Sequence, residues 1–170
     1  MKSSILIVTG AAECVHDDIM AAPINNKLAW MAIGLDAVDK YLYPIDYVAT
    51  FHPDEIPAIK ERRAKIGGNT DYKVISHEDK NNPDIVIKDW WKPTGSSALL
   101  GIQAAIEVLG YQRIILCGCP LIGKSVKGND YEVFRRGWEN NIDKIKDFVR
   151  SMSGWTRDFL GAPTEAWLNS

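Results

Sequence analysis

The fold is decided by residues 94–118, which read TGSSALLGIQAAIEVLGYQRIILCG. A small polar turn opens a stretch with apolar side chains at helical spacing, and Gly110 closes it, so we predict a helix over 96–109. Residues 113–117 follow as a mostly apolar run that ends at Gly118, which is typical of a strand covered on both faces. A helix that leads directly into such a strand is the repeating unit of a parallel α/β sheet.

The same succession of apolar run, turn and helix extends over most of the chain. We predict further strands over the apolar runs 5–8, 28–33, 46–51, 72–75 and 85–87. Amphipathic stretches predict further helices over 54–65 and 138–148. Strands that alternate with helices indicate an α/β fold of Rossmann type, with a doubly wound, mostly parallel sheet and helices on both faces.

Length, charge and cysteine spacing limit the function classes. The 170 residues fit a Rossmann-like nucleotide-binding domain over 1–153 and a tail over 154–170, which would form a helical cap or cover a partner subunit in a homo-oligomer. The net charge of −2 argues against nucleic-acid binding, and the apolar runs are too short for a signal peptide or a membrane span. We therefore expect a cytoplasmic protein. Its cysteines lack Cys-x-x-Cys spacing and are expected to be free thiols, not zinc ligands: Cys14, Cys117 and Cys119.

The front of the helix over 96–109 is the strongest candidate for a binding site. The first amides of a helix lack intrahelical acceptors and carry partial positive charge, and Gly95 lets a ligand approach the backbone. The hydroxyl groups of Thr94, Ser96 and Ser97 add hydrogen-bond donors. The site would bind a phosphate-bearing ligand, although a simple capping role for Ser96 or Ser97 explains the same residues.

Several parts of the chain resemble two related groups of proteins. Residues 94–99, 104–105 and 109–118 are similar to a segment shared by the bacterial sialyltransferases that use a CMP-linked sugar and the family that contains the archaeal 6-hydroxymethylpterin diphosphokinase. Residues 5–12, 46–52 and 149–154 resemble their first strand and nucleotide-binding turn, their third strand, and their late strand and turn. The resemblance touches most of the chain but is tight over only about two dozen residues.

The resemblance implies a nucleotide-dependent transferase that moves a glycosyl, phosphoryl or diphosphoryl group. The donor, a CMP-sugar or a nucleoside triphosphate, would lie between the turn at Gly10 and Ala11 and the loop 94–97, beside Gly118. A compact version of such an enzyme would suit a viral genome.

The chain differs from these families at two positions, which weakens the assignment of their functional residues to this chain. The families place an acidic residue two positions after the glycine that ends the last strand quoted, where this chain has Pro120. The sialyltransferases also place a catalytic histidine downstream, and no histidine follows His77. Both departures favour a non-catalytic protein that binds nucleotides or nucleotide sugars, and a structural protein that retains only the fold is a third alternative.

Catalytic candidates follow the predicted strand at 46–51. His52 lies just past its carboxyl end, where a histidine can act as acid or base, and Asp54 is close by. Alternatively, these two residues only cap the next helix. His16 follows the first glycine turn and could face the ligand or lie on a helix surface, whereas His77 has no evident role.

Other polar and aromatic residues permit two interpretations each. Asp17 and Asp18 could coordinate Mg²⁺ beside a diphosphate, or simply favour the start of a helix. The glycine-rich loop 123–128 could close over phosphates or an acceptor, or remain solvated, and the basic residues within and after it are Lys124, Lys127, Arg135 and Arg136. The tryptophans at 90–91 could stack on a base or a sugar ring, or belong to the core or an interface.

Overall fold

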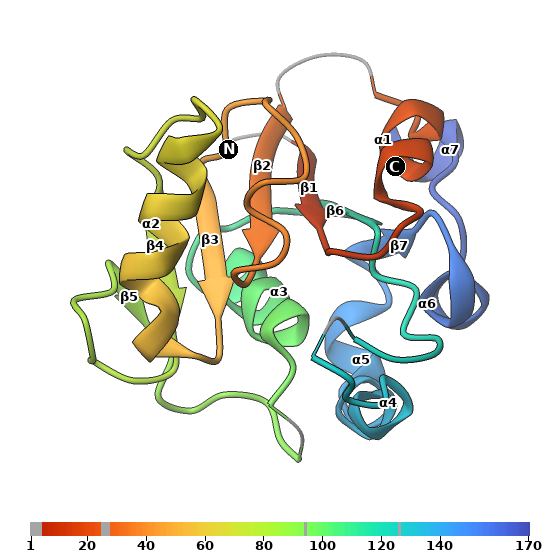
Figure 1. The fold of residues 1–170 in the computed structure, drawn as a ribbon. Coiled ribbons are helices and arrows are strands. Elements are labelled where there is room, and N and C mark those ends of the chain that lie inside the picture. The colour runs from red at the N-terminus through yellow and green to blue at the C-terminus, as the bar shows by residue number, and fades with distance from the viewer. Residues whose placement is uncertain (1–4, 25–27, 94, 126) are drawn as a thin grey trace.

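One seven-stranded sheet runs through the molecule, and every pair of neighbouring strands in it is parallel (Figure 1). The computed structural model describes residues 5–24, 28–93, 95–125 and 127–170. The strands are β1 (Ile5–Thr9), β2 (Leu28–Ile33), β3 (Tyr47–Thr50), β4 (Lys73–Ser76), β5 (Ile85–Val86), β6 (Arg113–Cys117) and β7 (Val149–Ser151). The predicted α/β fold of Rossmann type, with its parallel sheet, is confirmed.

The strand order β5-β4-β3-β2-β1-β6-β7 contains one reversal. From β1 the chain adds β2 to β5 outward on one side, and then α3 carries it back to the other side of β1, where β6 and β7 are added. Connections that leave β1 in opposite directions open a crevice at the carboxyl ends of β1 and β6. The topology therefore places the ligand crevice next to Gly10 and Gly118.

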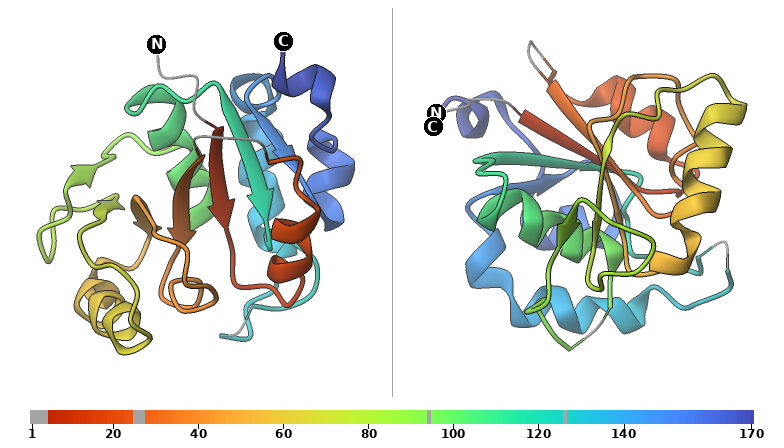
Figure 2. Two further views of the ribbon diagram at one scale, coloured as in Figure 1. Left: turned by 90° about the horizontal axis from the view of Figure 1, so that it is seen from above. Right: turned by 90° about the vertical axis from the view of Figure 1, so that its left-hand side faces the viewer.

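Helices cover both faces of the sheet (Figure 2). Residues of α3, α4, α5 and α6 share one core cluster with Leu6 and Val8 of β1, while residues of α1, α2 and α7 share the other with Ile7. The helical segments are α1 (Val15–Ala21), the 3₁₀ turn η1 (Pro53–Glu55), α2 (Ile56–Lys65), α3 (Ser97–Glu107), α4 (Glu132–Asn140), α5 (Ile142–Ile145), α6 (Gly154–Leu160) and α7 (Glu165–Leu168). This alternation along β1 is the expected consequence of a strand covered on both sides.

Helix α3 packs closely on the middle of the sheet. A Cβ atom added to Gly101 would lie 2.7 Å from Met31 Sδ and 3.0 Å from Ala49 Cβ. Only glycine lets the helix backbone approach β2 and β3 this closely. The position of α3, and of its first turn at the carboxyl ends of the strands, is thereby fixed.

One predicted helix needs correction, and one helix of the structure was not predicted. The predicted helix over 138–148 is wrong: α4 begins at Glu132 and ends at Asn140, and a separate short helix, α5, follows. The break comes at Asn141, whose buried side-chain amide donates to the carbonyl groups of Gly137 (2.7 Å) and Lys92 (3.1 Å). The apolar periodicity also did not predict α1, because its 7 residues span only two turns.

The tail after β7 packs on the rest of the chain. Leu160 of α6 is buried, and the ring of Trp167 lies between the guanidinium groups of Arg113 (5.2 Å) and Arg150 (5.1 Å). The division into a nucleotide-binding domain and a cap at residue 153 stays a prediction. Within the described part of the chain, no helix combines the length and the apolar character needed to cross a membrane.

Candidate functional site

A cleft opens at the carboxyl ends of the strands, where the topology predicts it. Its volume is about 890 Å³ when the space open to solvent is included. Its lining comes from the turns after β1, β2, β3 and β6, from the start of α3, and from the loop before α4. The described lining residues are Gly10, Ala11, Ile33, Gly34, Leu35, Asp36, His52, Glu55, Gly95, Ser96, Ser97, Ala98, Gly118, Cys119, Pro120, Leu121, Ser125, Lys127, Asn129, Tyr131 and Phe134.

The first turn of α3 faces this cleft. Ser96 is the N-cap, and its Oγ accepts from the amide of Leu99 at 3.3 Å. Ser97 Oγ accepts from the amide of Phe51 at 3.0 Å and so ties α3 to the end of β3. Both hydroxyl groups thus have structural roles, as the capping alternative expected, but both residues also line the cleft.

The backbone amides at the start of α3 are available to bind a ligand. The amides of Ser97 and Ala98 precede the first intrahelical bond, in which Leu100 donates to the Ser96 carbonyl at 2.9 Å, and they have no acceptor among the described residues. Together with the dipole of an 11-residue helix, they favour an anion. Thr94 lies outside the described residues, so the role of its hydroxyl group stays a prediction.

The turns after β1 and β6 interlock at the floor of the cleft. The Gly10 amide donates to the Cys117 carbonyl at 2.9 Å, and a Cβ atom on Gly10 would lie 2.1 Å from the Gly118 carbonyl oxygen and 2.8 Å from Cys119 Sγ. Gly118 has φ +67°, which favours glycine. The predicted ligand residues Gly10, Ala11 and Gly118 all line the cleft.

A buried carboxylate fixes this arrangement. Asp18 is 7% exposed, and its Oδ2 accepts from the Gly118 amide and from Ser153 Oγ, both at 2.7 Å. One oxygen of the Asp18 carboxylate is therefore engaged by donors of the protein itself, and a role of this residue in binding Mg²⁺ stays a prediction. Its neighbours Asp17 and His16 are exposed on α1 and do not line the cleft.

The two catalytic candidates separate in the structure. His52 is exposed and lines the cleft just past β3, and its backbone amide donates to Thr50 Oγ1 at 2.9 Å. Asp54 does not line the cleft, and its carboxylate pairs with Lys80 at 2.5 Å. The acidic residue that lies in the cleft beside His52 is Glu55.

A basic residue reaches the cleft from the loop between β6 and α4. Lys127 lines the cleft and pairs with Glu55. Lys124, the other lysine that the sequence indicated in this loop, does not line it, and its backbone pairs with that of Asp130. Sequence analysis missed Glu55 as a site residue, because its approach to the cleft depends on the tertiary fold, and only its position close to His52 could have indicated it.

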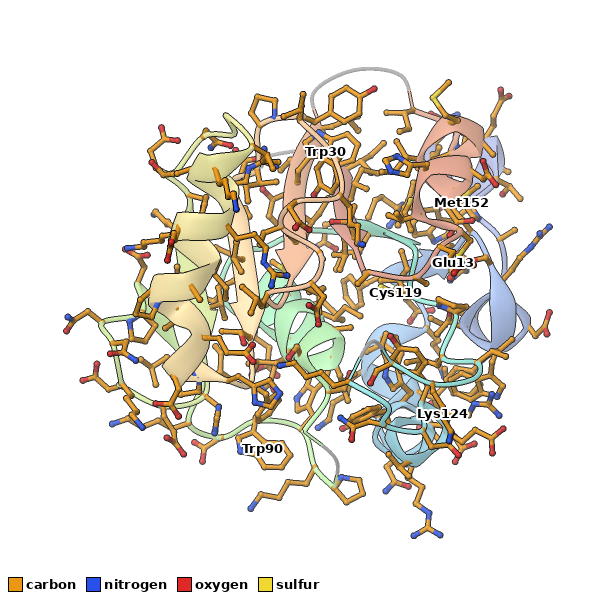
Figure 3. All side chains as sticks on the ribbon, viewed as in Figure 1. Glu13, Trp30, Trp90, Cys119, Lys124 and Met152 are labelled. Atoms are coloured by element: carbon orange, nitrogen blue, oxygen red, sulfur yellow. The ribbon has the colours of Figure 1, made fainter. Side chains whose placement is uncertain are left out.

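Of the two tryptophans before α3, Trp91 belongs to the core, and Trp90, labelled in Figure 3, packs against it. Trp91 is 7% exposed and its Nε1 donates to Glu107 Oε1 at 3.2 Å, while Trp90 packs edge to face on Phe51 at 5.0 Å between ring centroids. Neither tryptophan lines the cleft. The alternative in which they belong to the core therefore holds.

The cysteine thiols are free, and burial determines how easily they ionise. Cys117 and Cys119 are buried and unpaired, and burial raises the pKa of the Cys119 thiol to about 12. Across the described residues, no group of three or more His, Cys, Asp or Glu side chains is placed to hold a metal ion.

Comparison with known proteins finds similarity at the level of structure. No protein-family model matches the chain, and no curated protein sequence matches it significantly. The sialyltransferase CstII from Campylobacter jejuni, in complex with the substrate analogue CMP-3FNeuAc, superposes with a TM-score of 0.65 at 13% identity, covering 98% of this chain and 87% of that chain. CstII in complex with cytidine-5'-monophosphate gives a TM-score of 0.58 at 14% identity with the same coverage. At this identity the match shows one thing: this chain shares the fold of a sialyltransferase.

Proposed function

We propose that the protein is a transferase that binds a nucleotide sugar, with the phosphate of the donor at the start of α3. The observation that carries the proposal is the open cleft at the reversal of the strand order, which is lined by Ser97 and Ala98 at the start of α3. Gly95 and the turn residues Gly10, Ala11 and Gly118 line the same cleft. A CMP-sugar is the donor class that the shared fold favours, because CstII binds CMP-3FNeuAc and cytidine-5'-monophosphate.

In this proposal His52 acts as the general base. A ring nitrogen of His52 accepts the proton of the acceptor hydroxyl group as its oxygen bonds to the anomeric carbon of the sugar. The bond between that carbon and the phosphate oxygen breaks, and its electron pair stays on the phosphate of CMP. The amides at the start of α3 stabilise the charge that develops there.

Thermal unfolding in the presence of nucleotides tests the proposal. A ligand at a hundredfold excess over its Kd stabilises a folded protein by about 2.7 kcal/mol, which for a chain of this size raises Tm by roughly 5–10 °C. We expect CMP and CMP-sugars to produce this shift and UDP and ATP to produce less. Absence of any shift with all of these nucleotides at millimolar concentration would contradict the proposal and favour a protein that keeps only the fold.

Turnover separates an enzyme from a binding protein. His52→Ala should abolish transfer or hydrolysis of a CMP-sugar and leave CMP binding nearly unchanged, whereas His16→Ala, on exposed helix surface outside the cleft, should leave both unchanged.

A non-catalytic nucleotide-binding protein is the second candidate. The cleft lacks two acidic groups that a transferase of this kind could use, because Asp54 pairs with Lys80 outside the cleft and Pro120 occupies the position after β6. CMP binding without any release of sugar, in wild type and His52→Ala alike, would support this candidate.

A further inference from the structure

The cleft contains one ion pair that the proposed function leaves unused. The ammonium group of Lys127 pairs with Glu55 Oε1, and both residues line the cleft. Glu55 belongs to η1 after β3, and Lys127 to the loop between β6 and α4, 72 positions further along the chain. The pair therefore joins two segments of the cleft lining that meet only through the tertiary fold.

The charges around this pair limit how an anion can enter. The carboxylates in the described lining are Asp36 and Glu55, and Asp36 Oδ1 is already paired with Arg62 at 3.2 Å. Arg62 does not line the cleft. Among the described lining residues, Lys127 is the one side chain with a permanent positive charge, and Glu55 neutralises it.

We infer that Lys127 is a binding residue for the phosphate of the ligand, and that Glu55 holds its ammonium group at the cleft until the phosphate replaces the carboxylate. The inference rests on the proposed function, since it needs a ligand that carries a phosphate. It adds a residue that selects for the charge of the ligand, and of the two lysines that the sequence indicated in this loop it selects Lys127.

The exposure of the pair supports an exchange of partners. The side chains of Lys127 and Glu55 are 42% and 23% exposed, and ion pairs in contact with water are weak. A phosphate offers the ammonium group several oxygen acceptors and at the same time lies within the same cleft as the amides at the start of α3. Glu55 remains in the cleft as an unpaired anion after the exchange, so its charge opposes binding.

Calorimetric titration of single variants with CMP, cytidine and inorganic phosphate tests the inference. Lys127→Gln should weaken CMP binding about tenfold, because a hydrogen bond to a charged group is lost, and should leave cytidine binding unchanged. Glu55→Gln should tighten CMP binding roughly two- to fivefold, and this gain should disappear when Lys127 is also replaced. Matched controls are Lys80→Gln, which removes the lysine paired with the adjacent carboxylate outside the cleft, and Glu61→Gln on the exposed side of α2.

The results separate the inference from the proposed function. If CMP binds wild type and Lys127→Gln equally well, the inference is overturned while the proposed function stands. If no nucleotide binds but inorganic phosphate binds in a manner that depends on Lys127, the inference stands and the proposed function fails. If Glu55→Gln weakens CMP binding as much as Lys127→Gln does, the carboxylate supports the site and the exchange is refuted.

Discussion

Replacing Asp18 with alanine should destabilise the protein by about 3 kcal/mol. Asp18 Oδ2 accepts from the Gly118 amide and from Ser153 Oγ, both at 2.7 Å, and the residue is 7% exposed, so water cannot replace it. A hydrogen bond to a charged group contributes about 1.5–3 kcal/mol. The loss at Ser153 lies at the lower end, because its hydroxyl group retains Cys14 Sγ at 3.4 Å, whereas the Gly118 amide is left without a partner. Urea unfolding followed by tryptophan fluorescence measures the sum.

Two further variants isolate the contribution of the carboxylate. Asp17→Ala, one position earlier on the exposed side of α1, should cost about 0.5 kcal/mol or less, the value of one charge near a helix start. Ser153→Ala should cost about 1 kcal/mol, and the double variant with Asp18→Ala should cost less than the sum of the two. A free energy of unfolding for Asp18→Ala within about 0.5 kcal/mol of wild type would refute the view that this carboxylate fixes the floor of the cleft.

Three other predictions follow from the same region. Burial raises the pKa of Tyr41 from 10.0 to about 12, so its contribution of about 2–3 kcal/mol is complete below pH 10 and is lost as the pH rises toward 12. Urea unfolding at several pH values should show this slope, and Tyr41→Phe should reduce it without removing it, because burial also raises the pKa values of Tyr72 and Cys119 to about 12. Gly10→Ala should destabilise by roughly 1–3 kcal/mol, because the new Cβ meets the Gly118 carbonyl at 2.1 Å, whereas Gly95→Ala, with 3.4 Å to its nearest neighbour, should keep stability and weaken CMP binding in the same titrations. Because burial raises the pKa of the Cys119 thiol to about 12, that residue should react with a thiol reagent at pH 8 only after unfolding, and rapid labelling of the native protein, located by mass spectrometry, would contradict this.

The sheet could be predicted because its strands are apolar on both faces. The runs 28–33 and 113–117 coincide with β2 and β6, since strands that helices cover on both sides are mostly apolar. The ends of the helices could be predicted less well from the sequence. The break at Asn141 depends on a hydrogen bond to the carbonyl of Lys92, 49 positions away, and local periodicity carries no information about such a partner.

In the candidate site, too, some features could be predicted from the sequence and others could not. Glycine turns and the polar start of α3 are local signals, and they correctly indicated a cleft lined by Gly10, Ser97 and their neighbours. Which charged side chain enters the cleft is decided by tertiary contacts: Glu55 lies in it and Asp54, one position earlier, pairs with Lys80 outside. Adjacent residues with the same chemistry cannot be told apart from sequence alone.

The position of Pro120 explains where acid–base chemistry has to come from in this cleft. Its carbonyl group accepts from the amide of Trp155 at 2.9 Å, and Gly154, with φ +66°, packs so closely that a Cβ atom there would lie 2.3 Å from Pro120 Cβ. This position thus helps to dock α6 on the turn after β6, and the proline supplies no titratable group to the cleft. The histidine and the carboxylates of the described lining are His52 and Glu55 after β3 and Asp36 after β2, and Asp36 is paired with Arg62. If the protein catalyses transfer, the acceptor hydroxyl group must therefore approach from the β3 side of the cleft, and variants after β3 should change turnover while variants at Pro120 should change stability.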